Sequence, residues 1–508
     1  MLSLFPRANR HTLQLRTDHL TERDKAFCTP LQALDDAESS ASTLLSVSRL
    51  TDLPAAEIDL QDGDMEILSS DLTGLVEGVR SKKWTSTRMH HAFIRATRRA
   101  QLACNPVTVP NFATALRRAK ELDDEFAKNG ELAGPLHGIP FSIKEQYHIK
   151  GLTTTVGYTA WIQDGKAEED ASLAHIVYHL GGTILAKTNI PQTMLSFECR
   201  NPLYGRTTNP YSPGHTCGGS SGGEAALLAS DGCAAGFGSD IGGSLRIPSG
   251  YCGIYALKPT KGRLPSHGAK AARGGFEAIP VAVAQMCRSA ADVELLTRII
   301  IPLLHPAADN SGLDPREAQE RFGAEPLRPS PLRPAWFDPL RVSQARRRPL
   351  RIGHYSCDGI VKTSPACLRA MRESVAVLQD AYGSDVELVS IEPQALRSIE
   401  AMRIFLHAVG SDGFDGLLAP LKSGKVKEPM DCSLFLPVFA SRAASWLRKV
   451  IYWILRYAIR DHGLSHILNG GGRKTAGQHF ETVAQRDQFE EDFNKRIWKG
   501  YNLDAIIW

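Results

Sequence analysis

Apolar residues recur at helical spacing between residues 67 and 128, after a polar first stretch with no regular pattern. Four of them lie on one side of the first predicted helix: Leu72, Leu75, Val76 and Val79. Thr85 is a candidate N-cap for a second helix, and residues 112–126 form a third amphipathic helix. We expect these helices to cover one face of a sheet. Residues 1–60 are expected to form a loosely attached arm with one or two short helices.

Two short apolar runs have the composition of β-strands, and each ends in a lysine. The first ends at Lys144 and the second covers residues 183–187. A helical pattern at residues 171–180 lies between them and is followed by two glycines that are typical of a helix end. Strand, helix and strand in this order indicate an α/β fold. We predict a mixed β-sheet core covered by helices on both faces.

The second half of the chain also contains predicted helices and a strand, on either side of one irregular stretch. Helices are predicted at residues 289–304 and 364–381, and a strand at residues 351–353. Residues 306–349 are rich in proline and arginine, and we expect them to form a surface insertion.

The most apolar long segment covers residues 435–459. Arg442, Arg448 and Lys449 interrupt it, so it is a poor candidate for a transmembrane helix. Two interpretations have equal weight. The segment is either an amphipathic helix in a membrane interface or a pair of core helices whose basic side chains extend to solvent.

The composition is ordinary for a soluble globular protein, and a local basic patch stays open. The chain has 508 residues, 43% of them hydrophobic and 22% charged, with a net charge of +4, so nothing in its overall charge predicts a nucleic-acid partner. Its ten cysteines form no CxxC pair, and the N-terminus does not resemble a secretory signal. We therefore expect free thiols, no metal, no cofactor and an intracellular location, either cytoplasmic or peripherally membrane-associated.

Two glycine-rich turns carry the candidate chemistry. Ser220 lies within the run 218–223, and Ser244 follows Gly242 and Gly243, 24 positions later. Glycine at this density lets the backbone approach a ligand and direct N–H groups at a developing negative charge. A flexible linker would lack the apolar, helix-forming residues between the two turns. The pair of turns therefore predicts a site.

Two other motif interpretations are weaker. Gly218, Ser220 and Gly222 fit the nucleophile elbow of α/β-hydrolases, but no downstream histidine stands in a context that selects it. The Gly-x-Gly at residues 236–238 lacks the third glycine of a dinucleotide-binding fingerprint, and no phosphate-binding P-loop is present.

Three segments occur in a specific order: GIPFSIKE containing Lys144, CGGSSGGE containing Ser220, and SDIGGSLRIPSG containing Ser244. Together they resemble the amidase signature family, strongly over residues 65–300 and more weakly beyond. Within the family the chain is most similar to the fatty acid amide hydrolase branch, followed by fungal acetamidase-type members.

The resemblance implies an amidase signature fold. It predicts a single domain over residues 61–508, with the catalytic core at about 131–300. Relatives continue beyond the residues that match 503–508, so the C-terminal part is expected to be truncated, which would expose a sheet edge. Residues 281–288 also depart from the usual family sequence, and we expect this to alter a loop behind the site.

The resemblance also implies a mechanism. Ser244 would be the nucleophile, Ser220 a bridging serine in a cis Gly219–Ser220 peptide, and Lys144 a neutral base. Backbone N–H groups would form an oxyanion hole, and two side chains would lie near the substrate. The oxyanion hole would use Ile241, Gly242, Gly243 and Ser244, and the residues near the substrate would be Met194 and Ser196.

Residue chemistry supports part of this assignment. Ile139, Phe141 and Ile143 before Lys144 supply the desolvation that lowers a lysine pKa. Considered alone, Lys144 would be interpreted as a strand-end lysine paired with Glu145 or another carboxylate; the two serines together favour the neutral lysine. Met194 could equally be core packing. The remaining residues near the turns are interpreted as supports: Asp240 and Arg246 for the loop, Cys217 and Cys252 for packing, and Glu224 for a helix N-terminus.

The predicted function is a serine amidase that hydrolyses fatty acid amides or N-acyl amines to an acid plus an amine or ammonia. A small-amide hydrolase, a truncated non-catalytic paralogue and an amidotransferase subunit stay as alternatives. The expected partner is a small-molecule amide. Peripheral membrane contact through about 435–459 and a homodimer are both open.

Overall fold

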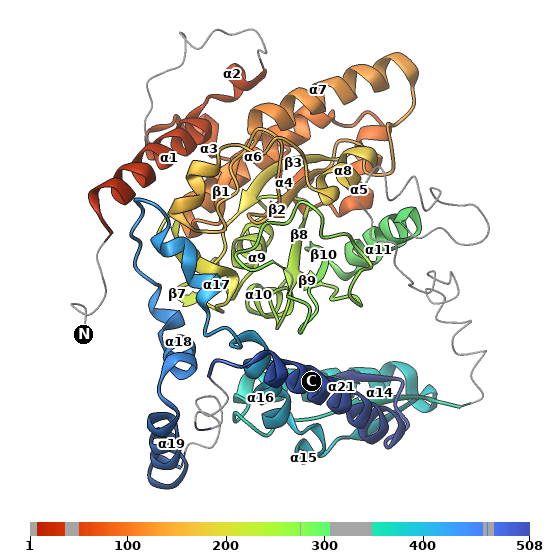
Figure 1. Cartoon of the computed structure of the whole chain (residues 1–508). Coiled ribbons are helices and arrows are strands. Elements are labelled where there is room, and N and C mark those ends of the chain that lie inside the picture. The colour runs from red at the N-terminus through yellow and green to blue at the C-terminus, as the bar shows by residue number, and fades with distance from the viewer. Residues whose placement is uncertain are drawn as a thin grey trace. The chain divides into compact units, whose positions relative to one another are not determined.

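The structure is a computed structural model that describes residues 8–35, 50–274, 276–304, 348–460, 465 and 472–507 (Figure 1). These residues form two compact units. The first takes its described residues from Met1–Gly275, Pro280–Pro331 and Gly416–Leu434, and the second from Phe276–Ile279, Leu332–Asp415 and Phe435–Trp508. The expected insertion lies almost entirely outside the described residues. The single domain over 61–508 stays a prediction.

A six-stranded mixed sheet forms the centre of the first unit, in the order β1-β3-β2-β8-β10-β9. Strand β2 runs parallel to β3 and β8, whereas β10 runs antiparallel to β8. Residues 281–288, whose sequence departs from that usual in the family, are the ones expected to alter a loop. Most of them form β10, which is a fully buried strand, so that expectation is wrong. The strands are β1 (Val107–Pro110), β2 (Pro140–Lys144), β3 (Thr183–Thr188), β8 (Ala235–Asp240), β9 (Tyr255–Ala256) and β10 (Ala282–Cys287).

Strand β2 directs polar side chains to one face of the sheet. Ser142 donates a hydrogen bond from Oγ to Glu224, which lies on α9 (Gly222–Ala229). Helix α9 packs across β1, β2, β3, β8 and β10. Since alternate residues of a strand point to the same side, Lys144 also points to the face that α9 covers.

The opposite face of β2 is apolar. Phe141 stacks on Phe237 of β8, with ring centroids 5.8 Å apart. A side chain added at Gly182 would lie 3.2 Å from the Phe141 ring and 2.9 Å from Val177 of α8 (Ser172–His179), so these two side chains are neighbours. Helices α8 and α9 therefore cover opposite faces of the sheet, which confirms the predicted architecture.

The helices expected before the sheet are present. All four apolar positions predicted on the first of them are buried. Thr85 caps α6, because its side chain accepts a hydrogen bond from the Arg88 N–H. The helices are α5 (Leu72–Arg80), α6 (Ser86–Cys104), α7 (Phe112–Asn129) and, after the sheet, α11 (Ala290–Leu304).

The N-terminal stretch is more firmly attached than its composition suggests. Helix α1 (Arg10–Cys28) has 19 residues, and Arg16 forms a 2.7 Å ion pair with the buried Glu428. Arg98 donates a hydrogen bond to the Phe27 carbonyl. The expectation of a loosely attached arm is therefore wrong for this helix. An ion pair and a hydrogen bond hold it in place, and such polar contacts leave no apolar periodicity in the sequence.

The second unit contains a three-stranded parallel sheet in the order β12-β11-β13. The predicted strand and the predicted helix at 364–381 are both found in it. Its described elements include β11 (Leu350–His354), α14 (Pro365–Tyr382), β12 (Val386–Ser390), α16 (Ser398–Val409), α21 (Ala476–Phe493) and β13 (Ala505–Ile507).

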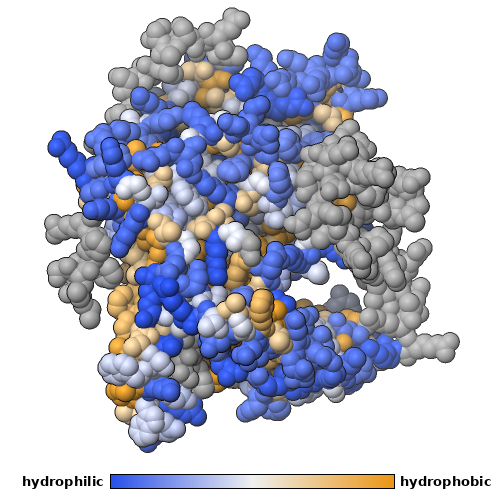
Figure 2. All heavy atoms as spheres, viewed as in Figure 1, coloured by the Kyte–Doolittle hydropathy of each residue, from blue (hydrophilic) through white to orange (hydrophobic). Residues whose placement is uncertain are grey.

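The apolar segment of the second unit forms α18 (Phe435–Arg442), α19 (Ser445–Trp453) and a π-helical segment η10 (Ile454–Ile459). Only four of its residues are buried: Val438, Ala440, Ser441 and Leu455. Most of its large apolar side chains are exposed, and Figure 2 shows hydrophobic residues gathered over α18 and α19. The core-helix interpretation is therefore wrong for most of the segment. Among the described residues no helix is long and apolar enough to span a bilayer.

Candidate active site

Lys144 ends β2 and has no exposed surface. Its Nζ lies 2.7 Å from Ser220 Oγ and 3.0 Å from Ser239 Oγ. Burial lowers the pKa of Lys144 to about 7, while the charges of Asp240, Cys199 and Glu224 act in the opposite direction. The side chain that sequence patterns nominate as a base therefore contacts one nominated serine and has a pKa suited to accepting a proton.

The alternative partner of Lys144 is engaged elsewhere. Glu145 accepts hydrogen bonds from the backbone N–H groups of Thr155 and Val156 and from the Thr155 hydroxyl. Its carboxylate therefore supports the loop after β2 and forms no ion pair with Lys144.

Ser220 lies between β7 (Ser212–Thr216) and α9, one residue before the α9 N-cap Ser221. The Gly219–Ser220 peptide is cis, as the resemblance implied. A side chain at Gly219 would lie 2.4 Å from the Ser196 carbonyl oxygen, so this position has room only for glycine. Ser220 is buried, and its hydroxyl meets Lys144.

Ser244 lies on the second glycine-rich turn, between β8 and α10 (Arg246–Cys252), and is buried. Its carbonyl oxygen accepts a hydrogen bond from the Ser221 N–H at 3.2 Å. This bond joins the two turns, so all three nominated catalytic residues belong to one buried cluster within the first unit.

Asp240 supports the second turn as expected. It accepts hydrogen bonds from the Gly243 and Leu245 N–H groups and forms an ion pair with Arg246. Although burial opposes ionisation, the hydrogen bonds from Arg246 and the backbone hold the pKa of Asp240 below its ordinary value. A fixed carboxylate at the base of the turn keeps the turn's shape.

The nominated oxyanion donors divide into two groups. Within the described residues, the N–H groups of Ile241, Gly242 and Ser244 have no hydrogen-bond acceptor. The Gly243 N–H differs, because it donates to Asp240 at 2.7 Å. Three of the four nominated donors are thus available for a ligand.

Two polar residues that sequence patterns did not nominate complete the lysine's surroundings. Ser239 Oγ donates to Gln146 Oε1 at 2.8 Å, so it faces Lys144 as an acceptor. A neutral lysine that donates one hydrogen to Ser239 can direct its lone pair at Ser220. Both residues could have been nominated from the sequence by their position, because Ser239 directly precedes Asp240 in the third motif and Gln146 follows Lys144 by two residues.

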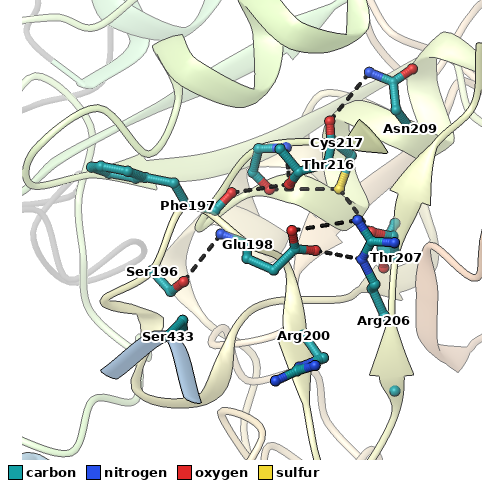
Figure 3. A network of polar contacts seen from close by, with 12 residues as sticks. Ser196, Phe197, Glu198, Arg200, Arg206, Thr207, Asn209, Thr216, Cys217 and Ser433 are labelled. Carbon is teal, nitrogen blue, oxygen red and sulfur yellow. Dashed lines mark hydrogen bonds and ion pairs between the residues drawn. The ribbon is translucent and has the colours of Figure 1, made fainter. Parts of the chain in front are cut away.

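Met194 and Ser196 occupy different environments. Met194 packs against a buried cluster that includes Val156, Tyr158 and Ile190, which agrees with the packing alternative; its place near a substrate stays a prediction. The Ser196 hydroxyl accepts a hydrogen bond from the Glu198 N–H (Figure 3).

The loop around Ser196 is held by polar contacts that also reach the first glycine-rich turn (Figure 3). Glu198 forms an ion pair with Arg206, and the Thr216 hydroxyl donates to the Phe197 carbonyl. Cys217 donates from Sγ to the Thr207 carbonyl. Cys217 and Cys252 are buried as expected for packing residues, and burial raises the pKa of Cys252 to about 12, which makes it a poor nucleophile.

Comparison with known proteins adds a family-level match. The sequence model of the family described as Amidase matches residues 88–456. Amidase 2 from Gibberella moniliformis is 41% identical over 248 residues, 49% of this chain and 47% of that protein. Acetamidase from Emericella nidulans is 32% identical over 344 residues, 68% of this chain and 60% of that protein. The chain thus spans less than two thirds of either relative.

Two further matches extend over more of the chain. Fatty-acid amide hydrolase 1 from Sus scrofa is 29% identical over 462 residues, 90% of this chain and 72% of that protein. A solved structure of a fatty acid amide hydrolase matches with a TM-score of 0.71 at 24% identity, over 97% of this chain and 76% of that one. The structural match supports the fold.

Proposed function

The chain belongs to the amidase family, and from this premise we propose that it is a serine amidase. It would hydrolyse carboxylic amides to an acid and an amine or ammonia through an acyl-enzyme. The observation that carries the proposal is the 2.7 Å contact between Lys144 Nζ and Ser220 Oγ, in a buried cluster that includes Ser244.

The proposed reaction begins with attack of Ser244 Oγ on the amide carbonyl carbon. The Ser244 proton passes to Ser220, while the Ser220 proton passes to neutral Lys144. Collapse of the tetrahedral intermediate breaks the C–N bond, and the leaving amine receives the proton returned through Ser220. Water then attacks the ester by the same route and releases the acid and free Ser244.

Negative charge on the carbonyl oxygen would be stabilised by backbone N–H groups of the second turn. Ile241, Gly242 and Ser244 supply these groups. Removal of a single donor of this kind typically costs about 10²–10³ in rate. Because Lys144 must be neutral to accept a proton and its pKa is lowered to about 7, we expect the rate to fall as the pH drops below that value.

The experiment that tests the mechanism is labelling with a fluorophosphonate serine probe. Ser244→Ala should abolish labelling, and Lys144→Ala should slow it by about 10²–10⁴. Ser249→Ala is a matched control, because Ser249 is also buried but its hydroxyl donates to the carbonyl of Leu245, the N-cap of α10. Labelling that survives in Ser244→Ala, or a folded wild-type protein that is never labelled, would contradict the proposal.

For the substrate class we favour fatty acid amides encountered at a membrane surface, with small soluble amides as the second candidate. The supporting observation is an exposed stripe at helical spacing on α19 and η10, formed by Trp446, Val450, Trp453 and Tyr457. Aromatic residues interleaved with basic ones suit the interface of a bilayer.

Vesicle flotation tests the membrane contact. Wild-type protein should float with anionic phospholipid vesicles, and Trp446→Ser combined with Trp453→Ser should abolish flotation. Leu13→Ser is the control, because Leu13 is 51% exposed but lies on α1, away from the stripe in sequence and in the other unit. Wild-type protein that does not float would favour small soluble amides.

A further inference from the structure

Glu224 is a fully buried carboxyl group in the first turn of α9, immediately after the first glycine-rich turn. Its Oε1 accepts a hydrogen bond from the Ser142 hydroxyl, and its Oε2 accepts one from the Thr188 hydroxyl at 2.6 Å. The sequence suggested only a favourable charge at a helix N-terminus. A solvated carboxylate would suffice for that role, so this buried and doubly bonded one needs another explanation.

The two hydroxyls place Glu224 beside Lys144. Ser142 precedes Lys144 by two positions on β2, so both side chains point to the face that α9 covers. Thr188 is the residue of β3 that pairs with Lys144 across the two strands, which lie about 5 Å apart in a sheet. Glu224 is therefore held by the two positions that flank the lysine.

Strand β8 provides the room for this carboxylate. A side chain at Gly236 would lie 1.7 Å from Glu224 Oε1 and 2.6 Å from Ser142 Oγ, so no other residue type fits there without moving Glu224. The chain thus encloses Glu224 among β2, β3 and β8, the three central strands around the proposed base.

The charge of Glu224 is less compensated than that of Asp240, the other carboxylate that acts on Lys144. Asp240 forms an ion pair with Arg246, whereas Glu224 takes part in no ion pair among the described residues. The thiol groups of Cys199 near Lys144, and of Cys233 and Cys287 near Glu224, complete the titratable surroundings. Both carboxylates favour the charged form of Lys144, Asp240 more than Glu224. In a buried site of low dielectric, a carboxylate without an ion-pair partner still acts on a nearby amine.

We propose that Glu224 is a positioning residue for the Lys144 base. Its carboxylate fixes Ser142 and Thr188 beside the lysine, and its negative charge contributes to the pH at which the lysine loses its proton. This inference rests on the proposed function, because it assigns Glu224 a task in that same proton transfer.

The protonation behaviour of the two groups agrees with this role. Burial raises the pKa of Glu224 to about 7, while hydrogen bonds from Ser142 and Thr188 and the charge of Lys144 act in the opposite direction. Burial lowers the pKa of Lys144 into the same range. Two neighbouring groups that titrate together influence each other's charge.

The test is the rate of fluorophosphonate labelling as a function of pH, for wild-type protein, Glu224→Gln and Glu145→Gln. Loss of the negative charge makes the protonated lysine less favourable. The pH at which the labelling rate falls to half on the acidic side, here called the acid limb, should therefore be about 0.5 pH unit or more lower in Glu224→Gln than in wild type. Glu145 is an equally buried carboxylate, but its partners are Thr155 and Val156. Its variant should keep the wild-type midpoint.

A purely structural role for Glu224 would lower the plateau rate and leave the midpoint in place, which would overturn the inference. Thr188→Val decides the question if Glu224→Gln does not fold. It removes one hydrogen bond that favours the carboxylate, so the limb should shift in the same direction by a smaller amount. If the acid limb does not move in either variant, the role of Glu224 is wrong but the proposed amidase function still holds. If wild-type protein is not labelled at any pH, both the role of Glu224 and the proposed function are wrong.

Discussion

The end of β2 and the helices of residues 435–459 differ in which side chains they bury. The first buries a charged side chain, and the second exposes apolar ones. At β2 the chain buries Lys144 completely, although removing a charge from water is costly. On α19 it leaves Trp446 and Trp453 68% and 65% exposed, although covering such side chains would be favourable. Both arrangements go against the ordinary preference of the residue type.

The difference lies in where the compensation comes from. Lys144 finds hydrogen-bond partners in Ser220 and Ser239 within its own unit, so the chain itself stabilises the exception. The exposed tryptophans have no such cover from the described residues of their unit. Local departures from residue preference often mark functional sites. The first agrees with the proposed proton transfer, and the second agrees with the proposed membrane contact.

The first prediction tests whether the buried hydroxyl groups around Lys144 take part in proton transfer or are ordinary packing groups. Ser220→Ala should slow fluorophosphonate labelling by about 10²–10⁴, because the proton would lose its route from Ser244 to Lys144. Ser221→Ala, at the adjacent buried serine, should have a much smaller effect, since the one acceptor of the Ser221 hydroxyl among the described residues is the Ser239 carbonyl, at 3.4 Å. Equal effects would contradict the proton route.

The second prediction compares a buried and an exposed phenylalanine of the first unit by their effect on stability. Phe141→Ala should lower the free energy of unfolding by about 3–5 kcal/mol, because it empties a buried site against Phe237. Phe197→Ala should change it by no more than about 0.5 kcal/mol, because that ring is 59% exposed. Thermal unfolding of both variants checks this. Similar losses would mean that burial does not govern stability here.

The third prediction tests how tightly the side chain of Glu224 is enclosed, by comparing two glycine-to-alanine variants. Gly236→Ala should lower the free energy of unfolding by about 1–3 kcal/mol, because the added carbon collides with the Glu224 carboxylate and Ser142. Gly250→Ala, on α10, has no neighbour within 4 Å and should raise it by about 0.5–1 kcal/mol through helix preference. Denaturant unfolding measures both. A neutral Gly236→Ala would mean that Glu224 can move freely.

Sequence patterns predicted the parts of the fold that depend on neighbours along the chain. The strand ending at Lys144, the strand over residues 183–187 and the cap at Thr85 follow from alternation, spacing and local hydrogen bonding. The motif order located both serine turns. Contacts between distant segments were not predictable, because periodicity carries no information on which strands pair.

Three examples show that limit. Ser239 meets Lys144 across 95 positions, and Ser142 meets Glu224 across 82, because β2 lies between β3 and β8. Arg16 anchors α1 to Glu428 across 412 positions.

The apolar segment after Phe435 posed a different problem. Its spacing suits a buried helix and an exposed amphipathic one equally, and only the three-dimensional environment separates them.

The final prediction compares two lysines. Lys449 lies exposed beside the stripe, so Lys449→Gln should weaken binding to anionic vesicles by about fivefold, which corresponds to roughly 1 kcal/mol per basic residue near such a surface. Binding to neutral vesicles and the free energy of unfolding should not change measurably. Lys144→Ala should do the reverse, with labelling slowed and vesicle binding retained, because Lys144 has no exposed surface. Co-sedimentation at low ionic strength measures the binding. An equal loss on neutral vesicles would mean that Lys449 acts through folding, and the exposed stripe would then need a partner other than an anionic membrane.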